Sequence, residues 1–352
     1  MTETKLDNNV IMFPGLQQPN LHNKQFQDVA MEWLFDEIKG TVSSRTLEWY
    51  YKTIINHFSP AFGEKGVNHI ELEEVLRLLT SMSIKIPRTT KLAVMLFKRI
   101  MVYAFDNHYL HQSWPIHKIR IVKNFKKREI KYIPQALRGT VLELASEHQL
   151  LYPILATSMF TGLRPGELIA LKWPKINFQT GFINILETIT YDVDVTPLGV
   201  TNKRDIDSKT KTECGMRKNK APKIVLQALL VWRHYCIQKG IYDPTGYVFV
   251  SSKGKRRTYS GLDSLYRRFS KKHEKALNGL RIIPKMPRHT CATMLLENKV
   301  NPKIVQKVLG HKHVQTTLDT YSHVSEEVLE AVALKLNDIY PDIMCNTYDP
   351  KI

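Results

Sequence analysis

One short segment places an arginine on a turn between two helical stretches. It reads TGLRPGELIALKW, residues 161–173, where Gly162 is suited to end one helix and Pro165 to begin the next. Arg164 stands between them, and a guanidinium held on such a turn can donate two parallel hydrogen bonds to a phosphate. Glu167 is expected to brace this arginine or to cap the turn, and an ordinary first-turn helix acid is the alternative. Because Arg-Pro-Gly also occurs at ordinary helix junctions, the segment alone predicts either an anion site or a simple connection.

The composition favours a polyanionic partner for such a site. The chain has 352 residues, with 51 Lys and Arg against 33 Asp and Glu, so its formal net charge is +18. This excess is spread along the chain, and hydrophobic residues make up 43%. A folded basic protein of this kind is typical of nucleic-acid binding, and nucleic acid is favoured over an acidic membrane surface.

The sequence shows none of the usual signals for membranes, secretion or metals. No stretch approaches the roughly 18 apolar residues of a membrane span, and the start MTETKLDNN does not resemble a signal peptide. We therefore expect a cytoplasmic protein without membrane association. The four cysteines form no CxxC pair, and the HxH pair of His311 and His313 has no evident third ligand. We expect neither a metal nor another cofactor.

Apolar periodicity divides the chain into two parts. Residues 1–24 are expected to form a polar arm, and residues 25–117 show four helical patterns that predict a compact helical module. Residues 134–340 are predicted to form a second, mostly helical domain, followed by a tail at 341–352. Within this second domain FINILETITY alternates like a strand, and KAPKIVLQALLVW is interpreted as a strand at 223–226 that runs into a helix.

Two basic segments are expected to contact DNA phosphates. The first is the connector 118–133, for which a solvated linker is the alternative interpretation. The second is a polar hairpin predicted at 203–223, which holds eight cations and three acids, so its tip should lie against phosphate. The expected DNA contacts are Lys118, Arg120, Lys123, Lys126, Lys127 and Arg128 of the connector, and Lys209, Arg217 and Lys218 of the hairpin.

A longer segment resembles the C-terminal signature of the tyrosine recombinases. It reads PKMPRHTCATMLLENKVNPKIVQKVLGHKHVQTTLDTYSHV, residues 284–324. The family signature is His or Lys, two residues, Arg, a helix, Leu-Gly-His and a tyrosine nine or ten residues later. Here these positions are Lys285, Arg288, Leu309-Gly310-His311 and Tyr321, and Arg164 matches the family's first arginine. The likeness extends over roughly residues 26–335.

This resemblance implies a fold and an activity. The fold would be mainly helical with a small β-sheet, a helical SAM-like core-binding domain followed by a tyrosine-recombinase catalytic domain. The activity would be site-specific cleavage and rejoining of double-stranded DNA through a 3′-phosphotyrosyl intermediate, for integration or excision of a prophage or other mobile element. A homotetramer on paired sites would be the active assembly, and accessory directionality or DNA-bending proteins could assist it. One ester replaces another, so neither ATP nor a metal is required.

The resemblance also implies a role for each signature residue. Tyr321 would attack the scissile phosphate, while Arg164 and Arg288 would hold its non-bridging oxygens. His311 would donate a hydrogen bond to the same phosphate. Lys285 stands where most members carry histidine, so charge stabilisation is its expected role rather than that of a neutral base.

Two other functions share part of this pattern. A non-catalytic DNA-binding regulator of the helix-turn-helix type would have the same composition but no use for Tyr321 and its two arginines. A type IB topoisomerase-like enzyme would use the same catalytic groups and relax DNA as a monomer. Length and domain order favour the recombinase.

A general acid must protonate the leaving 5′-oxygen, and the family supplies it from a lysine on a β-hairpin between the two arginine blocks. The stretch SKTKTECGMR offers two candidates. We favour Lys211, because it leaves the shorter insertion before the strand predicted at 223–226. Lys209 is the alternative.

A substrate with a 5′-bridging phosphorothiolate tests this assignment. Its thiolate leaves without a general acid, so this substrate should restore the cleavage that Lys211→Ala loses on ordinary DNA. The rate of covalent adduct formation on a denaturing gel measures the effect. Restoration in Lys209→Ala instead would shift the assignment by two residues.

Overall fold

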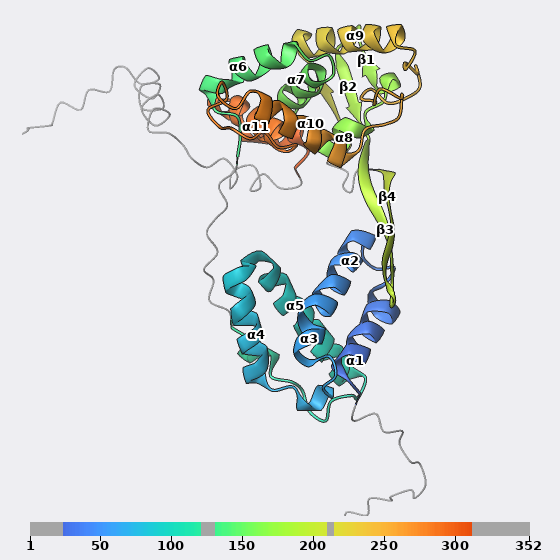
Figure 1. The fold of residues 1–352 in the computed structure, drawn as a ribbon, viewed down its shortest axis with the longest axis vertical. Coiled ribbons are helices and arrows are strands. Elements are labelled where there is room, and N and C mark those ends of the chain that lie inside the picture. The colour runs from blue at the N-terminus through green and yellow to red at the C-terminus, as the bar shows by residue number, and fades with distance from the viewer. Residues whose placement is uncertain (1–23, 121–130, 210–214, 312–352) are drawn as a thin grey trace, which may run out of the picture. The chain divides into compact units, whose positions relative to one another are not determined.

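The computed structural model describes residues 24–120, 131–209 and 215–311 (Figure 1). The chain divides into two compact units. Of the described residues, the first unit comprises 24–120 together with Tyr191–Arg204, and the second comprises 131–190, 205–209 and 215–311. The first unit therefore includes a segment that the sequence pattern placed in the 134–340 domain.

Helices build the first unit, in agreement with the helical patterns predicted over 25–117. Trp33–Ile38 continues α1 and Ile54–Phe58 continues α2 as π-helical turns. The helices are α1 Phe26–Glu32, α2 Ser44–Thr53, α3 Ser59–Phe62, α4 Leu72–Lys85 and α5 Pro87–Asp106. Their core contains a cluster of phenylalanines whose ring centroids lie 4.9 to 6.0 Å apart, namely Phe26, Phe58, Phe62 and Phe97.

A long hairpin completes the core of the first unit. It consists of β3, Glu187–Thr196, and β4, Gly199–Lys209. Val193 and Val195 near its tip are each 4% exposed and belong to the same buried cluster as the helices. This packing joins the hairpin tip to the first unit.

A buried carboxylate on α2 strengthens this packing. Glu48 accepts a hydrogen bond from the Tyr191 hydroxyl and pairs with Lys203 and Lys52, each at 2.7 Å. Burial by itself would raise the pKa of Glu48, but these three donors lower it to about 2. The hairpin thus supplies two of the partners that keep this carboxylate ionised.

The structure corrects two predictions in this region. The hairpin expected at 203–223 is wrong, because residues 203–209 form the return strand of a hairpin whose turn is Pro197 and Leu198. The strand expected at 223–226 is also wrong, because α9 begins at Lys223 with Pro222 as its N-cap. Its apolar residues recur at helical spacing, and the buried ones are Val225, Ala228, Leu229, Trp232 and Cys236. The strand lies upstream of this helix, as β5, Arg217–Lys220.

The second unit packs helices around a three-stranded antiparallel sheet. The sheet order is β1-β2-β5, with Ile176 opposite Ile183 and Phe182 opposite Lys220. The strands are β1 Ile176–Asn177, β2 Phe182–Ile185 and β5 Arg217–Lys220. The helices are α6 Gln135–Ser146, α7 Leu151–Thr161, α8 Pro165–Ala170, α9 Lys223–Gln238, α10 Tyr259–Lys272, α11 Met286–Glu297 and α12 Pro302–Leu309.

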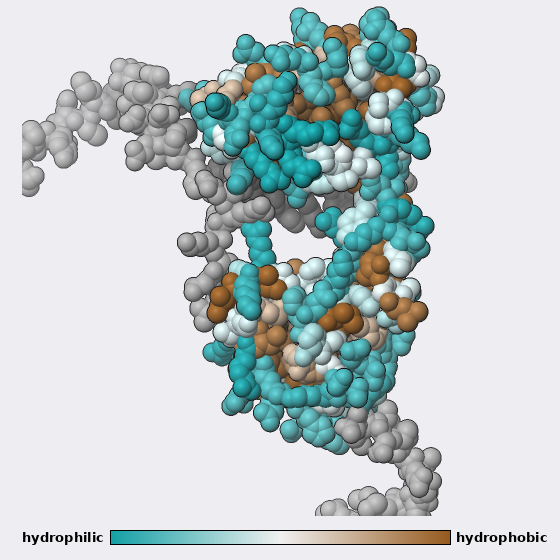
Figure 2. Space-filling model, viewed as in Figure 1, coloured by the Kyte–Doolittle hydropathy of each residue, from teal (hydrophilic) through white to brown (hydrophobic). Residues whose placement is uncertain are grey.

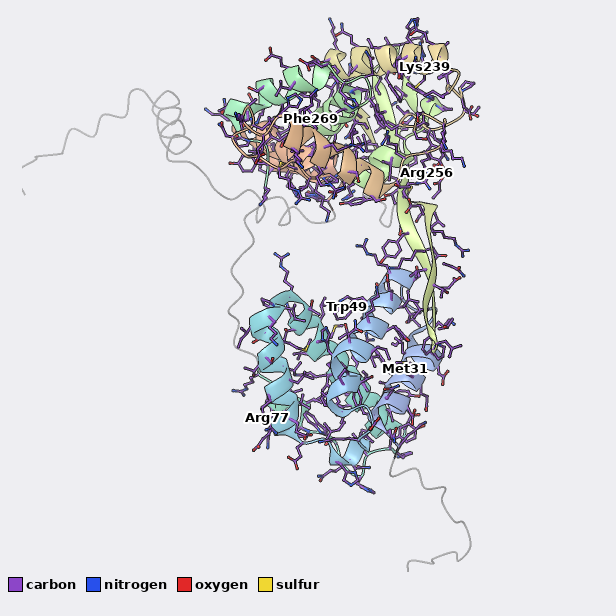
Figure 3. All side chains as sticks on the ribbon, in the orientation of Figure 1. Met31, Trp49, Arg77, Lys239, Arg256 and Phe269 are labelled. Atoms are coloured by element: carbon purple, nitrogen blue, oxygen red, sulfur yellow. The ribbon has the colours of Figure 1, made fainter. Side chains whose placement is uncertain are left out.

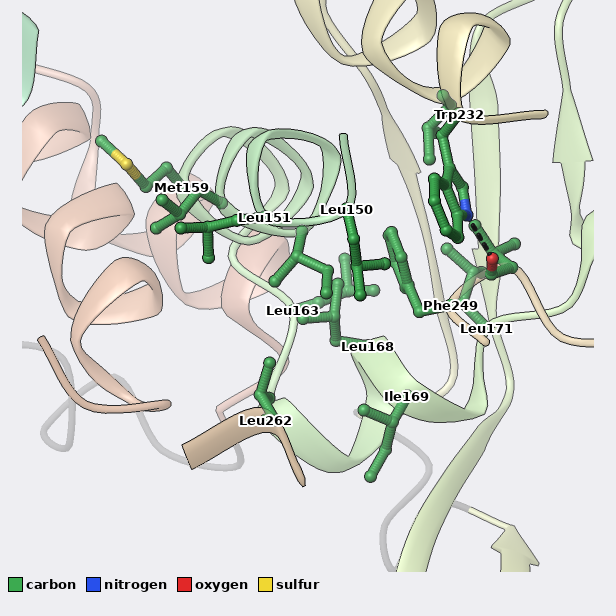
Figure 4. Packing of buried hydrophobic residues seen from close by; sticks show 14 of the residues in the cluster. Leu150, Leu151, Met159, Leu163, Leu168, Ile169, Leu171, Trp232, Phe249 and Leu262 are labelled. Carbon is green, nitrogen blue, oxygen red and sulfur yellow. Dashed lines mark hydrogen bonds between the residues drawn. The ribbon is translucent and has the colours of Figure 1, made fainter. Parts of the chain in front are cut away.

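Helix α7 lies at the centre of this unit, packed against α6, α9 and α11. Figure 4 shows Leu151 and Met159 of α7 among the buried side chains, with Leu163 and Leu168 just beyond its end. The Trp232 Nε1 donates to the Val248 carbonyl at 2.6 Å. The turn after α7 therefore starts from a helix that is packed against three others.

Hydrophilic residues cover much of the visible face of each unit, with separate hydrophobic patches (Figure 2). Within the second unit, Arg256, which is labelled in Figure 3, donates to the Asp205 carbonyl at 3.3 Å. None of the described helices is long and apolar enough to span a membrane.

The hairpin tip can be tested by truncating one of its buried valines. Val195→Ala should destabilise the first unit by about 1.5–3 kcal/mol, because two buried methyl groups are lost and a cavity remains. Native-state hydrogen exchange of the α2 amides reports this local stability. Leu198→Ala at the 99% exposed turn is the control and should change it by less than about 0.5 kcal/mol. Equal protection in both variants would show that the tip does not stabilise α2.

Candidate active site

The predicted arginine turn is present between α7 and α8. Gly162 follows α7 with φ +66°, and Arg164 is the extended N-cap residue before Pro165. A Cβ at Gly162 would lie 2.7 Å from a side-chain carbon of Leu309. The glycine therefore permits both the left-handed turn and the close approach of the end of α12.

Glu167 lies behind this turn with its side chain 1% exposed. Its Oε2 accepts from the Arg164 backbone N–H at 2.8 Å, and its Oε1 accepts from Arg164 Nη1 at 2.6 Å. Glu167 thus braces the arginine and also caps the start of α8, so both roles considered from the sequence apply.

Two more arginines surround the same carboxylate. Arg217 Nη1 and Nη2 donate to Glu167 Oε1 and Oε2 at 3.0 and 2.8 Å, and Arg288 Nη1 lies 3.9 Å from Oε2. Burial acts to raise the pKa of Glu167, but Arg217, followed by Arg288 and Arg164, holds that pKa below its usual value. One carboxylate among three guanidiniums leaves a local excess of positive charge, as an anion site requires.

The same three arginines hold the end of α12. The last carbonyls of a helix lack intrahelical partners and form its negative end, where cations are favourable. Each of three consecutive carbonyls here accepts from a different guanidinium. The pairs are Arg217 Nε with Val308 at 2.7 Å, Arg288 Nη2 with Leu309 at 2.7 Å, and Arg164 Nη2 with Gly310 at 2.6 Å. His311 follows directly after this turn.

Arg288 and Lys285 lie at the start of α11. Arg288 is 6% exposed, and its Nη1 also donates to the Gly162 carbonyl at 2.7 Å. Lys285 is the exposed N-cap residue of the same helix. The structure therefore brings Arg164, Arg288 and His311 together, as the signature predicted, with Lys285 on the adjoining turn.

His311 is half-buried beside these cations. Burial, followed by the charges of Arg288 and Arg164, lowers the pKa of His311 to about 4. The imidazole is therefore neutral at neutral pH, and a neutral imidazole carries one N–H donor. His289, on the first turns of α11, has its pKa lowered to about 4 by burial and by Arg288 and Lys285.

Several predicted residues lie outside the described part of the chain, and their roles stay predictions. These are Tyr321, Lys211, Lys123, Lys126, Lys127 and Arg128. Lys209 is the last residue of β4. Lys118 and Arg120 are exposed, and Lys218 is exposed on β5 with its Nζ 4.2 Å from the centre of the Phe182 ring.

The predicted DNA contact of Arg217 requires correction. Its side chain is 5% exposed, and each of its three nitrogens donates to Glu167 or to a backbone carbonyl. This arginine is therefore buried in the site rather than displayed on the surface. The charge count over 203–223 could not distinguish these two situations.

Asn219 is a site residue that the sequence pattern missed. It is 6% exposed, and its Nδ2 donates to the carbonyls of Thr161 and Val308 at 2.8 and 2.9 Å. Arg217 and Asn219 alternate along β5 with the exposed Lys218 and Lys220. The sequence signal that could have found Asn219 is the alternation in RKNK, because a period of two indicates a strand, here one with a polar inward face.

The neutral state of His311 can be measured by NMR. In ¹⁵N-histidine-labelled protein, assigned with His311→Gln, the His311 imidazole should titrate near pH 4 rather than at the ordinary 6.5. Arg164→Gln should raise this midpoint, because one repelling cation is removed while burial remains. The unfolded state binds the proton more readily, so His311 weakens folding progressively as the pH falls from about 6.5 towards 4. A midpoint close to 6.5 would refute this electrostatic description.

Known proteins are similar to this chain in sequence and in fold. The model of the phage integrase family matches residues 123–327. The XerC-like tyrosine recombinase of Caldanaerobacter subterraneus subsp. tengcongensis is 25% identical over 348 residues, which cover 90% of this chain and 85% of that protein. Transposase A from transposon Tn554 of Staphylococcus aureus is 31% identical over 217 residues, covering 60% of this chain and 51% of the transposase.

Solved structures show the same fold. The Tn1549 transposon integrase in complex with transposon right end DNA has a TM-score of 0.71 at 18% identity, covering 89% of this chain and 99% of that chain. A lambda integrase dimer bound to a COC′ core site has a TM-score of 0.59 at 14% identity, covering 87% and 80%. Since the family model spans more than half of the sequence and includes the arginine turn and the Leu-Gly-His turn, the chain belongs to the phage integrase family of tyrosine recombinases.

Proposed function

We propose that this protein carries out site-specific DNA recombination at the arginine cluster, with Tyr321 as the nucleophile. The observation that supports this most directly is the convergence of Arg164, Arg217 and Arg288 on one buried carboxylate, next to His311. Tyrosine recombination needs a fixed positive environment for a phosphate whose negative charge increases in the transition state. Guanidiniums suit this role because they stay charged at any working pH.

Arg164 and Arg288 bind the non-bridging oxygens of the scissile phosphate in this proposal. The Arg164 side chain is 38% exposed, so a phosphate can reach it from solvent. Arg288 is more deeply placed and is held by the carbonyls of Gly162 and Leu309. His311 donates a hydrogen bond as a neutral imidazole, which adds no further positive charge to a crowded cationic site. Lys285 stabilises charge from the start of α11.

The chemical step exchanges one phosphate ester for another. The Tyr321 phenol loses its proton to water as its oxygen forms a bond to phosphorus, the bond from phosphorus to the 5′-oxygen breaks, and Lys211 gives a proton to that oxygen. The phenol has a reference pKa of about 10, and a positive field favours its ionised form. Attack by a 5′-hydroxyl on the phosphotyrosine reverses the step and rejoins a strand without ATP.

The biological role follows from the relatives. Their names associate them with transposons Tn554 and Tn1549 and with the lambda integrase. We therefore assign to this protein the integration or excision of a prophage or another mobile element. Exchange between two duplexes breaks four strands, so four protomers on paired sites supply one tyrosine each. Accessory DNA-bending or directionality proteins would act on this assembly, and Lys118, Arg120 and Lys218 would contact the DNA.

Tyr321→Phe tests the nucleophile directly. The variant should form no covalent protein–DNA adduct on a nicked suicide duplex, because only the attacking oxygen is removed. Its affinity for a single site should stay within about threefold of wild type, measured by fluorescence anisotropy. Tyr340→Phe is the matched control and should form adduct at the wild-type rate. Adduct from the Tyr321→Phe variant would refute the assignment.

A further inference from the structure

Arg217 is a buried arginine with an unusual set of partners. Its side chain is 5% exposed, and it lies on β5, outside the two signature segments of the sequence. The Nη atoms donate to both oxygens of Glu167, and Nη1 also donates to the Gly215 carbonyl at 3.2 Å. Its Nε donates to the Val308 carbonyl at 2.7 Å. Burying a charge in this way is costly unless every donor is satisfied, and here each nitrogen has an acceptor.

These bonds join three segments that are far apart in the sequence. Through Glu167, Arg217 is connected to Arg164 at the start of α8. Through Val308, it is connected to the turn that precedes His311. Only a guanidinium can make both connections, because its planar fork pairs with the carboxylate while Nε donates to the side. A lysine at this position could supply charge but not this geometry.

We propose that Arg217 is a positioning residue of the recombination reaction, which acts through Glu167 and the Val308 carbonyl and does not touch DNA. It keeps Arg164 and His311 in register for the scissile phosphate. The inference rests on the proposed roles of Arg164 and His311, and it adds a group from a third segment to the site.

Loss of Arg217 should disturb both of its neighbours. Val308 would lose a strong donor and keep the hydrogen bond from Asn219, so the turn that carries His311 would be less firmly held. Glu167 would lose its bidentate partner, and its carboxylate would be shared between Arg164 and the more distant Arg288. Misplacement of a catalytic group by about 1 Å can cost on the order of 10²-fold in rate.

The first measurement separates cleavage from binding. Single-turnover adduct formation on the suicide duplex should be slower by on the order of 10²-fold in Arg217→Met, while affinity for a single site stays within about threefold. Arg217→Lys keeps the charge and should remain slower than wild type by at least about tenfold, because the Val308 bond is not rebuilt. A rate loss matched by an equal affinity loss would indicate a DNA contact and overturn the proposal.

The second measurement is a pH profile, which a merely structural residue would not change. Arg217 opposes the effect of burial on Glu167, so its removal should raise the pKa of this carboxyl. The deficit of Arg217→Met should therefore grow as the pH is lowered from about 8 to about 5.5, as Glu167 becomes protonated. Arg217→Lys should show the wild-type profile. A deficit in Arg217→Met that is constant with pH would overturn the role through Glu167.

Arg138 offers a matched control in the same unit. Its Nη atoms form a bidentate pair with Glu297 at 2.6 and 2.9 Å, and its Nε donates to the Ile133 carbonyl at 3.1 Å. Arg138→Met therefore removes the same kinds of bonds at a place outside the arginine cluster. It should lower the melting temperature but leave the cleavage rate within about threefold at every pH.

The remaining outcomes also decide the proposal. Cleavage by Arg217→Met within threefold of wild type, or a loss equal to that of Arg138→Met, would overturn it. If Arg217→Met does not fold, a wild-type rate in Arg217→Lys would overturn it instead.

Glu167→Gln combined with Arg217→Met should lose little more cleavage rate than the worse single variant, because the two residues act together. Adduct formation by Tyr321→Phe would refute the proposed nucleophile, whereas a normal rate in Arg217→Met would refute only this inference.

Discussion

The end of helix α12 is the constraint on which the candidate active site depends. Three successive carbonyls there need donors, and three arginines from β5, α11 and the α7–α8 turn supply them. The arginines are in turn kept together by Glu167, which balances one of their three charges. Each guanidinium is therefore oriented before any phosphate arrives. A preoriented cation need not reorganise during the reaction, which is the condition for electrostatic catalysis to be effective.

The same arrangement explains the protonation states in the site. A carboxylate and an imidazole lie among the same cations, and both are partly removed from water. For Glu167 the cations oppose burial and keep the carboxylate charged, whereas for His311 they act in the same direction as burial and keep the ring neutral. The site thus holds one anion, three cations and a neutral donor at neutral pH. Its net positive charge is set by the arginines and does not depend on histidine protonation.

Local turn chemistry allowed part of this site to be predicted. Gly162 and Pro165 mark a helix end and a helix start, and the family spacing identified Arg288 and His311. Asn219 was not identified as a site residue and Arg217 was assigned to the DNA surface, because their partners lie on segments distant in sequence and a charged strand resembles a solvated one. The strand placed at 223–226 was wrong because a short apolar run fits a strand or a helix equally well. The helical spacing of buried residues continues to Cys236, and a run of this length indicates a helix.

The net charge of the whole chain indicates a polyanionic partner, whereas the charge of a single segment does not identify its contacts. Both results have the same physical cause. Within residues 203–223, Lys203 pairs with Glu48, Arg204 with Asp192 and Arg217 with Glu167, so these cations hold the protein together. Their partners lie elsewhere in the sequence, and a local count therefore overstates the charge available to DNA. Each pair removes one positive and one negative charge, so the excess of +18 is unchanged by any amount of internal pairing. The argument for a polyanionic partner thus belongs to the chain as a whole, while the contacts must be assigned from the fold.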